Sequence, residues 1–243
     1  MNLTNEEQAL LSVIQEARAG KKTTPGKDES RGVTLEGAYR IQQANRGERV
    51  LKGYKFGLLS PAKQSQMGIS TPLYGPIYMD TIYQNRVSLS DFIQPRFEPE
   101  IAAILRDPIP AGASAQSIEA AIAGYFLGVD ILDSIWEGYK FTAAEVAADN
   151  TSQGGFLPSQ VMRLSRPQGE LGLYMNGAFR CGGDLAELGD TVERLAWLAE
   201  TVGGLEAGMM IFFGSPAAAI PAETGALEVV AADGHVMVAK IEA

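Results

Sequence analysis

The sequence contains one cysteine, Cys181, and one histidine, His235, in 243 residues. A single cysteine excludes an internal disulfide and a cysteine-based zinc cluster, which indicates an intracellular protein that we place in the cytoplasm. A single histidine argues against a Ser-His-Asp triad. His235 itself directly follows Asp233-Gly234, so we expect it just past a hairpin turn.

Long apolar runs and an excess of positive charge are also missing. No apolar run reaches the roughly 18 residues of a membrane-spanning helix, and the polar residues 1–7 lack the apolar stretch of a signal peptide. The formal net charge is −9, so the surface repels nucleic acid and anionic membranes, and we expect neither as a partner. An anionic small substrate remains compatible with this charge, because a bound metal ion inverts the local field.

Glycine and proline are frequent, with 27 and 12 residues, so many tight turns are expected. Asn176-Gly177 and Asp233-Gly234, each flanked by apolar residues, indicate two β-hairpins. A capping box at Thr4 and apolar residues at helical spacing predict helices near the N-terminus. We therefore predict an α+β fold, with a helical segment over residues 1–50 and a β-rich mixed-sheet core over residues 51–243 that forms a single structural unit.

Two glutamates share one face of a strand expected over residues 96–105. Side chains alternate along a strand, so Glu98 and Glu100 point to the same side. Neighbouring carboxylates repel unless a positive group lies between them, and a hard cation such as Mg²⁺ or Mn²⁺ prefers oxygen ligands. The alternative is that both glutamates face solvent or pair with Arg96.

Further charged residues lie in strands expected over residues 51–58 and 125–132. Asp130 lies within an apolar strand, where an unpaired carboxylate is unfavourable. Asp133 follows at the end of the same strand, as a site residue or as a turn or cap residue. Lys55 lies in an otherwise apolar strand, and a buried lysine needs an acid or an anionic ligand, whereas an edge strand would leave it at the surface.

Two polar loops and one expected turn complete the candidate segments. Residues 148–155, ADNTSQGG, have two interpretations: they line a pocket with amide and hydroxyl donors, or they only end a helix. Residues 213–216, FGSP, follow a buried strand and either present backbone N–H groups to a carboxylate or form a plain turn. Residues 72–76, PLYGP, predict a turn because proline and glycine alternate with other residues there.

In this order, these segments resemble the 2-keto-4-pentenoate hydratase / 4-oxalocrotonate decarboxylase family of the fumarylacetoacetate hydrolase superfamily. The resemblance is colinear over roughly residues 35–241, and it rests on the combination of segments rather than on any one motif. The matching segments are GYKFGL (53–58), AK (62–63), QMG (66–68), PLYGP (72–76), QPRFEPEIA (94–102), DILDS (130–134), ADNTS (148–152) and FGS (213–215).

The resemblance implies a divalent-metal-dependent lyase that acts on a small 2-oxo or 2-hydroxydienoate acid in the meta-cleavage catabolism of aromatic compounds. It assigns Mg²⁺ or Mn²⁺ to Glu98 and Glu100, with Asp130 where the family usually has a third glutamate. Lys55 matches a lysine near the substrate, and Asp80 falls near an acidic residue that helps proton transfer.

The resemblance also implies a pocket lining and a choice of reactions. Ser152 and Ser215 match positions that line the substrate pocket, and Gly214 lies beside them as a backbone donor. We expect a hydratase, because Asp80 falls where hydratases have an acid. The alternative is a 4-oxalocrotonate decarboxylase, because residues 62–68 and 137–141 look more like that branch.

A third alternative belongs to another class: a weakly active or non-catalytic partner subunit of a hydratase–decarboxylase complex. Asp130 and Asp190, where the family has glutamate and histidine, favour it. The family resemblance suggests a homo-oligomer or a complex with a homologous decarboxylase or hydratase. A hydrolase that cleaves carbon–carbon bonds needs a histidine-assisted base, and the lone His235 argues against it.

Overall fold

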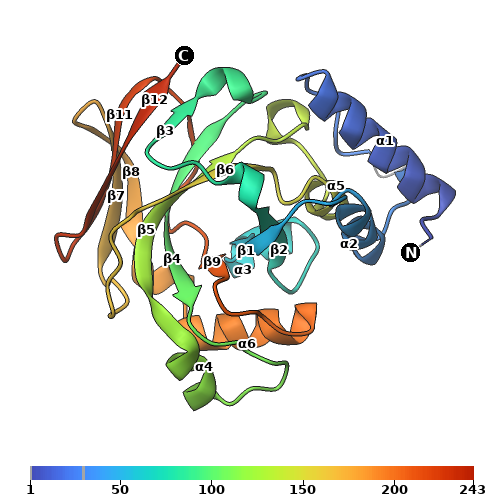
Figure 1. The fold of residues 1–243 in the computed structure, drawn as a ribbon. Coiled ribbons are helices and arrows are strands. Elements are labelled where there is room, and N and C mark those ends of the chain that lie inside the picture. Colours follow the sequence, from blue (N-terminus) through green and yellow to red (C-terminus); the bar gives the residue numbers. More distant parts are fainter. Residues whose placement is uncertain (1, 29–30) are drawn as a thin grey trace.

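The computed structural model describes residues 2–28 and 31–243, and two β-sheets form its centre (Figure 1). Within these residues the larger sheet has seven strands in the order β2-β1-β9-β4-β5-β6, with β10 paired to the start of β4. Its neighbours are antiparallel except β1 and β9, which are parallel. The strands are β1 (Leu51–Gly57), β2 (Leu73–Tyr78), β4 (Arg96–Leu105), β5 (Ile122–Leu132), β6 (Gln153–Pro158), β9 (Met210–Phe212) and β10 (Ile220–Pro221).

A second sheet, with five strands among the described residues, packs against the larger one in the order β3-β12-β11-β7-β8. Both predicted hairpins are confirmed, since Asn176-Gly177 joins β7 to β8 and residues 233–234 join β11 to β12. Val129 of β5 and Leu173 of β7 lie in one buried cluster between the sheets. The strands are β3 (Arg86–Ser88), β7 (Glu170–Met175), β8 (Ala178–Asp184), β11 (Gly225–Ala231) and β12 (Val236–Glu242).

Helices cover the sheets in two groups. α4 and α6 lie side by side at the bottom of Figure 1, and α6 buries Leu195 and Leu198 in the cluster between the sheets. α1, α2 and α5 form the other group, at the right of the figure. The helices are α1 (Asn5–Ala19), α2 (Leu35–Ala44), α3 (Pro61–Gln66), α4 (Ala115–Ala121), α5 (Ala143–Ala148) and α6 (Thr191–Val202).

The N-terminal helices pack into the β-rich core. The predicted capping box is confirmed: the Thr4 hydroxyl accepts from the Glu7 N–H, and the Glu7 carboxylate accepts from the Thr4 N–H. Ile14 of α1 lies in one hydrophobic cluster with Leu73 of β2 and with Trp136. The two segments therefore share buried surface, and their division into separate parts stays a prediction.

The turn predicted over residues 72–76 is wrong, because the structure has strand β2 there. β2 is the edge strand of the larger sheet and pairs with β1 alone. An edge strand tolerates Pro76, which has no backbone N–H to donate. The carbonyl groups of Tyr74 and Pro76 accept hydrogen bonds from the side chains of Thr151 and Asn150 instead. The free edge of β2 thus fixes the loop that precedes β6.

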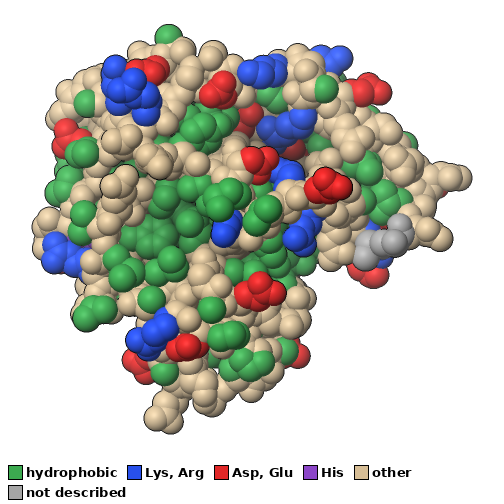
Figure 2. Space-filling view, in the orientation of Figure 1, with side chains coloured by type: hydrophobic (Ala, Val, Ile, Leu, Met, Phe, Trp, Pro, Cys, Tyr) green, Lys and Arg blue, Asp and Glu red, His purple; other side chains and the backbone are tan. Residues whose placement is uncertain are grey.

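The surface mixes charged and apolar residues. Figure 2 shows hydrophobic side chains gathered near the centre of the viewed face, in front of β4, β5 and β9. Lys and Arg side chains lie along one side of this apolar patch. Among the helices of the described residues, none combines the length and the apolar character that crossing a membrane requires.

Candidate active site

Three carboxylates meet on one face of the larger sheet. β4 and β5 are antiparallel neighbours, and their register places Glu98 directly opposite Asp130. Because side chains alternate along a strand, Glu100 points to the same face as Glu98. One oxygen of each of the three residues lies within 4.8 Å of the others. The structure therefore contains the convergence of acids that the sequence predicted, with two carboxylates from β4 and one from β5.

The acid cluster is largely buried, and its negative charge is not fully compensated by neighbouring groups. Glu100 and Asp130 are buried, and Glu98 is partly exposed to an adjoining cavity. Among the described residues, Glu100 Oε1 and Asp130 Oδ1 have no hydrogen-bond partner. Burial raises the pKa of Glu98 to about 7, and the negative charge of Asp130 adds to the rise. Burial also raises the pKa of Glu100 and of Asp130.

The acid cluster fits a hard divalent cation. Mg²⁺ and Mn²⁺ prefer oxygen ligands, and every donor in this group is a carboxylate oxygen. A cation between the carboxylates removes their mutual repulsion and compensates for the buried charge. The two unpartnered oxygens of Glu100 and Asp130 are the atoms that such an ion would satisfy.

Lys55 supplies one positive charge at the edge of the acid cluster. It lies on β1, and its Nζ is 2.7 Å from Asp130 Oδ2. Both side chains are 1% exposed, so Lys55 is a buried lysine paired with an acid, and the alternative of a surface lysine is wrong. The ammonium group of Lys55 balances one of the three carboxylates. The acid cluster can therefore still bind a metal cation.

Gly214 holds Glu100 in place just after β9. Its N–H donates a hydrogen bond of 2.8 Å to Glu100 Oε2, so this predicted backbone donor serves a carboxylate of the acid cluster, and Gly214 itself lines the cavity. Its φ of 84° lies in the left-handed region, and a Cβ there would come within 2.4 Å of the Leu59 side chain. Ser215 lines the cavity as predicted, and its hydroxyl accepts from the Ala217 N–H at 3.1 Å.

Ser152 reaches the cavity from a strained turn. Asn150, Thr151 and Ser152 have φ values of 50°, 57° and 57°, a left-handed conformation that costs roughly 1–2 kcal/mol per non-glycine residue. Hydrogen bonds of 3.1 Å from Asn150 to the Pro76 carbonyl and 3.0 Å from Thr151 to the Tyr74 carbonyl hold the turn. The Ser152 hydroxyl is buried, borders the cavity and has no partner among the described residues. Strain of this kind is typical of functional sites.

The acid cluster borders a cavity of about 310 Å³. Glu98, Asp130, Lys55 and Ser152 supply buried or half-buried polar groups to its lining. Two exposed residues of opposite charge, Lys63 and Glu187, mark its solvent side; sequence reasoning singled out neither as a site residue. The apolar lining includes Leu58, Leu59, Leu132, Phe141, Val146 and Leu188.

Known proteins resemble the chain over most of its length, although no protein-family model matches it. A 4-oxalocrotonate decarboxylase from a Pseudomonas species is 31% identical over 226 residues, which cover 87% of this chain and 88% of that protein. A 2-keto-4-pentenoate hydratase from Burkholderia vietnamiensis is 29% identical, with 82% of each covered. The structure of the 4-oxalocrotonate decarboxylase from Pseudomonas putida G7, complexed with magnesium and adipate, has a TM-score of 0.87 and 27% identity over 99% of both chains.

The chain belongs to the 2-keto-4-pentenoate hydratase / 4-oxalocrotonate decarboxylase family. Both activities named in this family are lyase reactions, so the chain is an enzyme of the lyase class. Two solved structures of lower identity share the fold: a putative fumarylpyruvate hydrolase from Burkholderia cenocepacia (18% identity, TM-score 0.61) and a putative fumarylacetoacetate isomerase/hydrolase from Oleispira antarctica (20% identity, TM-score 0.58). The predicted α+β fold of that superfamily, with a β-rich mixed-sheet core, is confirmed.

Asp80 does not lie where the family resemblance placed it. It is part of a 3-10 turn, Met79–Thr81, that follows the end of β2. Its side chain is 61% exposed, and both of its oxygens accept hydrogen bonds from Arg49, the closer at 2.9 Å. Asp80 is not part of the cavity lining. The structure thus leaves Asp80 at the surface in an exposed ion pair, and its expected role in proton transfer is corrected.

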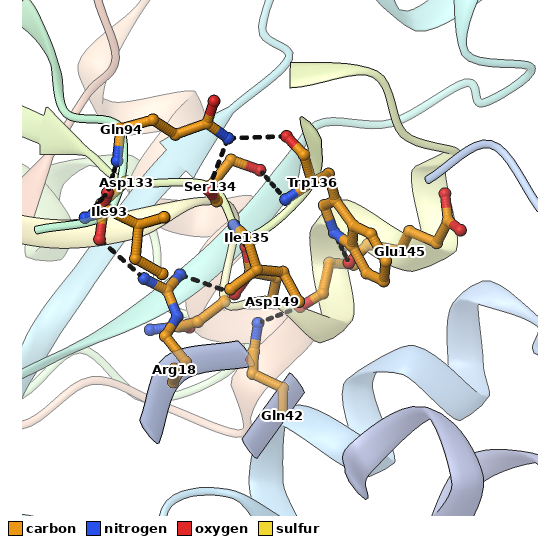
Figure 3. A network of polar contacts seen from close by, with 12 residues as sticks. Arg18, Gln42, Ile93, Gln94, Asp133, Ser134, Ile135, Trp136, Glu145 and Asp149 are labelled. Carbon is orange, nitrogen blue, oxygen red and sulfur yellow. Dashed lines mark hydrogen bonds and ion pairs between the residues drawn. The ribbon is translucent and has the colours of Figure 1, made fainter. Parts of the chain in front are cut away.

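A polar network beside the cavity contains residues that sequence reasoning missed. Arg18, in the last turn of α1, lies between Asp133 and Asp149 and pairs with both (Figure 3). Asp133, which the sequence left open, does not line the cavity, and its carboxylate accepts hydrogen bonds from the N–H groups of Ile93 and Gln94. The two aspartate partners of Arg18 lie 115 and 131 positions after it in the sequence, and no local sequence pattern connects residues so far apart.

Proposed function

We propose that the chain is a divalent-metal-dependent lyase for a small 2-oxo acid, with Mg²⁺ or Mn²⁺ held by Glu98, Glu100 and Asp130. One observation carries this proposal: three acids converge beside a cavity, and two of their buried oxygens have no partner among the described residues. The family member from Pseudomonas putida G7 supports it, because its structure contains magnesium together with adipate, a small organic acid.

The residues around the cavity have separate roles in this proposal. A divalent ion, when bound, stabilises negative charge that develops on the 2-oxo oxygen of the substrate. Lys55 holds or releases a proton at Nζ, beside the cavity, and its charge favours an anionic acid. Ser152 donates a hydrogen bond from its unpartnered hydroxyl to a substrate oxygen. The apolar lining keeps water away from the carbon chain, which strengthens these interactions.

The first reaction we propose is decarboxylation of a six-carbon 2-oxo diacid such as 4-oxalocrotonate. The C5–C6 bond breaks, CO₂ leaves, and the bonding electron pair moves through the conjugated chain to the 2-oxo oxygen, giving an enolate that is then protonated. Lys63 favours this substrate, because it lines the cavity and takes part in none of the ion pairs found among the described residues. Its charge suits a second carboxylate, which a monoacid lacks.

Hydration of a 2-hydroxydienoate monoacid is the second candidate. Water adds across the distal double bond, forming a C–O bond and a C–H bond and giving a 4-hydroxy-2-oxo acid. The hydratase from Burkholderia vietnamiensis, 29% identical to this chain, supports it. The sequence argument for this reaction depended on Asp80, and the exposure of Asp80 is why we place decarboxylation first.

Turnover of the two acids separates these reactions. Protein loaded with Mg²⁺ or Mn²⁺ is given each acid, and both CO₂ release and loss of diene absorbance are measured. Decarboxylation predicts CO₂ from the diacid, whereas hydration predicts loss of the monoacid without CO₂. Lys63→Gln should raise KM for the diacid roughly tenfold, which corresponds to a loss of about 1.4 kcal/mol of binding free energy. Glu187→Gln should lower that KM, because it removes a negative charge from the same cavity. If the loaded protein consumes neither acid, the proposal is wrong.

A partner subunit without strong activity is the alternative from another class. Such a chain would bind no metal, turn over no 2-oxo acid and still co-purify with a homologous decarboxylase or hydratase. The convergent acids and the adjoining cavity argue against it.

We also propose that the protein is a cytoplasmic homo-oligomer. The apolar patch of Figure 2 offers a contact surface between its subunits, and light scattering measures the mass of the assembly.

A further inference from the structure

Arg18 joins the N-terminal helix α1 to two buried acids near the cavity. Its Nη1 lies 3.0 Å from Asp133 Oδ2, and its Nη2 lies 2.7 Å from Asp149 Oδ1. The side chain of Arg18 is 29% exposed, whereas those of the two aspartates are only 4% and 1% exposed. In the described part of the chain, no other cation forms an ion pair with either aspartate. One guanidinium is therefore the single ion-pair partner that two buried carboxylates share in the described structure.

The second oxygen of each aspartate holds a loop backbone (Figure 3). Asp133 Oδ1 accepts hydrogen bonds of 2.8 Å from the N–H groups of Ile93 and Gln94, just before the strand that carries the glutamates of the acid cluster. Asp149 Oδ2 accepts a hydrogen bond of 3.0 Å from the Ile135 N–H. These donors lie outside the strands, so the two carboxylates supply contacts that no sheet ladder provides.

The same two aspartates hold Ser152 through its backbone. The Asp133 N–H donates to the Ser152 carbonyl at 2.7 Å, and the Ser152 N–H donates to the Asp149 carbonyl at 3.0 Å. Ser152 is therefore held from both sides by residues that Arg18 binds. The carboxylates of Glu98 and Asp130, in contrast, lie on β4 and β5, whose paired backbones fix them independently of this network.

We propose that Arg18 is a positioning residue that sets the Ser152 hydroxyl for substrate by bridging Asp133 and Asp149. The inference rests on the function proposed above. Without the guanidinium, two buried carboxylates lose the one cation that pairs with them in the described structure, and they must take up protons or turn towards water. Either change loosens a turn that is held in an unfavourable backbone conformation, so the Ser152 hydroxyl loses its position. Helix α1 thereby becomes part of the active site without touching the substrate.

Two substitutions at position 18 separate positioning from folding. Arg18→Met removes the charge, whereas Arg18→Lys keeps it but cannot reproduce the two-pronged contact. Calorimetry measures Mg²⁺ affinity and then the affinity of the loaded protein for oxalate, and steady-state kinetics give kcat and KM for the consumed acid. We expect Arg18→Met to bind Mg²⁺ within about twofold of the parent protein while kcat/KM falls roughly 10- to 100-fold, the range seen for such supporting contacts. Arg18→Lys should recover part of the loss.

Arg40→Met is the matched control. Arg40 is also 29% exposed and also pairs with a buried acid, Glu7, but its contacts join α2 to α1, and it does not line the cavity. This variant should lose thermal stability while the folded protein keeps the parent kcat and KM. The same behaviour in Arg18→Met, lower stability with unchanged kcat and KM, would overturn the inference. Should Arg18→Met fail to fold, Arg18→Lys provides the comparison.

The proposed function and this inference fail in different ways. If the parent protein binds neither Mg²⁺ nor oxalate, the proposed function fails, and the role of Arg18 falls with it. If the parent protein binds both and turns over its acid, but Arg18→Met does so equally well, only the role of Arg18 is wrong.

Discussion

Lys55 Nζ lies 2.7 Å from Asp130 Oδ2, and both side chains are 1% exposed to solvent. The pair joins β1 to β5, which are separated in the larger sheet by β9 and β4. It also places the only buried ammonium of the described residues against a cluster of three acids. Stability and ion binding are therefore coupled at this point of the fold.

Removing Lys55 should destabilise the ion-free protein. Breaking a buried ion pair on one side leaves an uncompensated charge, so we expect Lys55→Met to lower the free energy of unfolding by about 3–5 kcal/mol. Urea unfolding measures this change. Arg49→Met is the control, because it breaks the exposed pair with Asp80 and should cost less than about 1 kcal/mol. Equal stability of Lys55→Met and the parent protein would contradict the assigned pairing.

Replacing a glutamate of the acid cluster should weaken ion binding. Glu98→Gln and Glu100→Gln each remove a negative oxygen donor while keeping side-chain size, so Mg²⁺ affinity should fall at least roughly tenfold, or about 1.4 kcal/mol. Isothermal calorimetry gives the affinity directly. Asp80→Asn should leave it unchanged, since Asp80 lies at the surface. A full-strength Mg²⁺ site in both glutamine variants would show that the ion binds elsewhere.

The ion-free protein should lose stability as pH rises towards 7. Burial and the Asp130 charge raise the pKa of Glu98 from 4.5 to about 7. Between these values the folded protein binds more protons than the unfolded chain, so its free energy of unfolding falls with rising pH. An ion must displace this proton, so Mg²⁺ affinity should increase over the same window. Calorimetry from about pH 5.5 to about pH 8 tests this, and an affinity independent of pH would count against it.

The Ser152 hydroxyl should matter for turnover and hardly at all for stability. It makes no hydrogen bond within the described structure, so Ser152→Ala removes no folding contact. A hydrogen bond to a charged group contributes about 1.5–3 kcal/mol, so kcat/KM should fall roughly 10- to 100-fold. Thr151→Val, which loses the bond to the Tyr74 carbonyl, should instead cost about 1 kcal/mol of stability. Thermal unfolding and steady-state kinetics compare the two variants, and unchanged kinetics in Ser152→Ala would remove Ser152 from the site.

Strand geometry made the acid cluster predictable. Alternation along β4 fixes Glu98 and Glu100 to one face whatever the rest of the fold does. Asp130 was an outlier in an apolar strand, and a buried acid of this kind requires a partner, which Lys55 supplies. The hairpins at residues 176–177 and 233–234 depend only on local backbone preferences, and they too were predictable.

Sheet edges and long-range contacts were not predictable. Residues 72–76 have the composition of a turn, but their place at the edge of the larger sheet makes proline acceptable in a strand. Asp80 follows this strand out to solvent, so a role carried over by resemblance failed there. The Gly214 N–H is used by Glu100, and Arg18 binds aspartates far along the chain. Each of these outcomes depends on a tertiary neighbour that no local pattern reveals.

The parallel pairing of β1 with β9 determines when, during synthesis of the chain, the ion pair between Lys55 and Asp130 can form. Residues 53–55 pair with residues 210–212, so this pairing cannot form until residues 210–212 have left the ribosome. Because β9 is the strand between β1 and β4, Lys55 cannot meet Asp130 before this late segment arrives. Pairing between such distant segments is slow, and open strand edges invite association with other chains in the meantime. We expect nascent chains that stop before β9 to aggregate rather than to hold an ion.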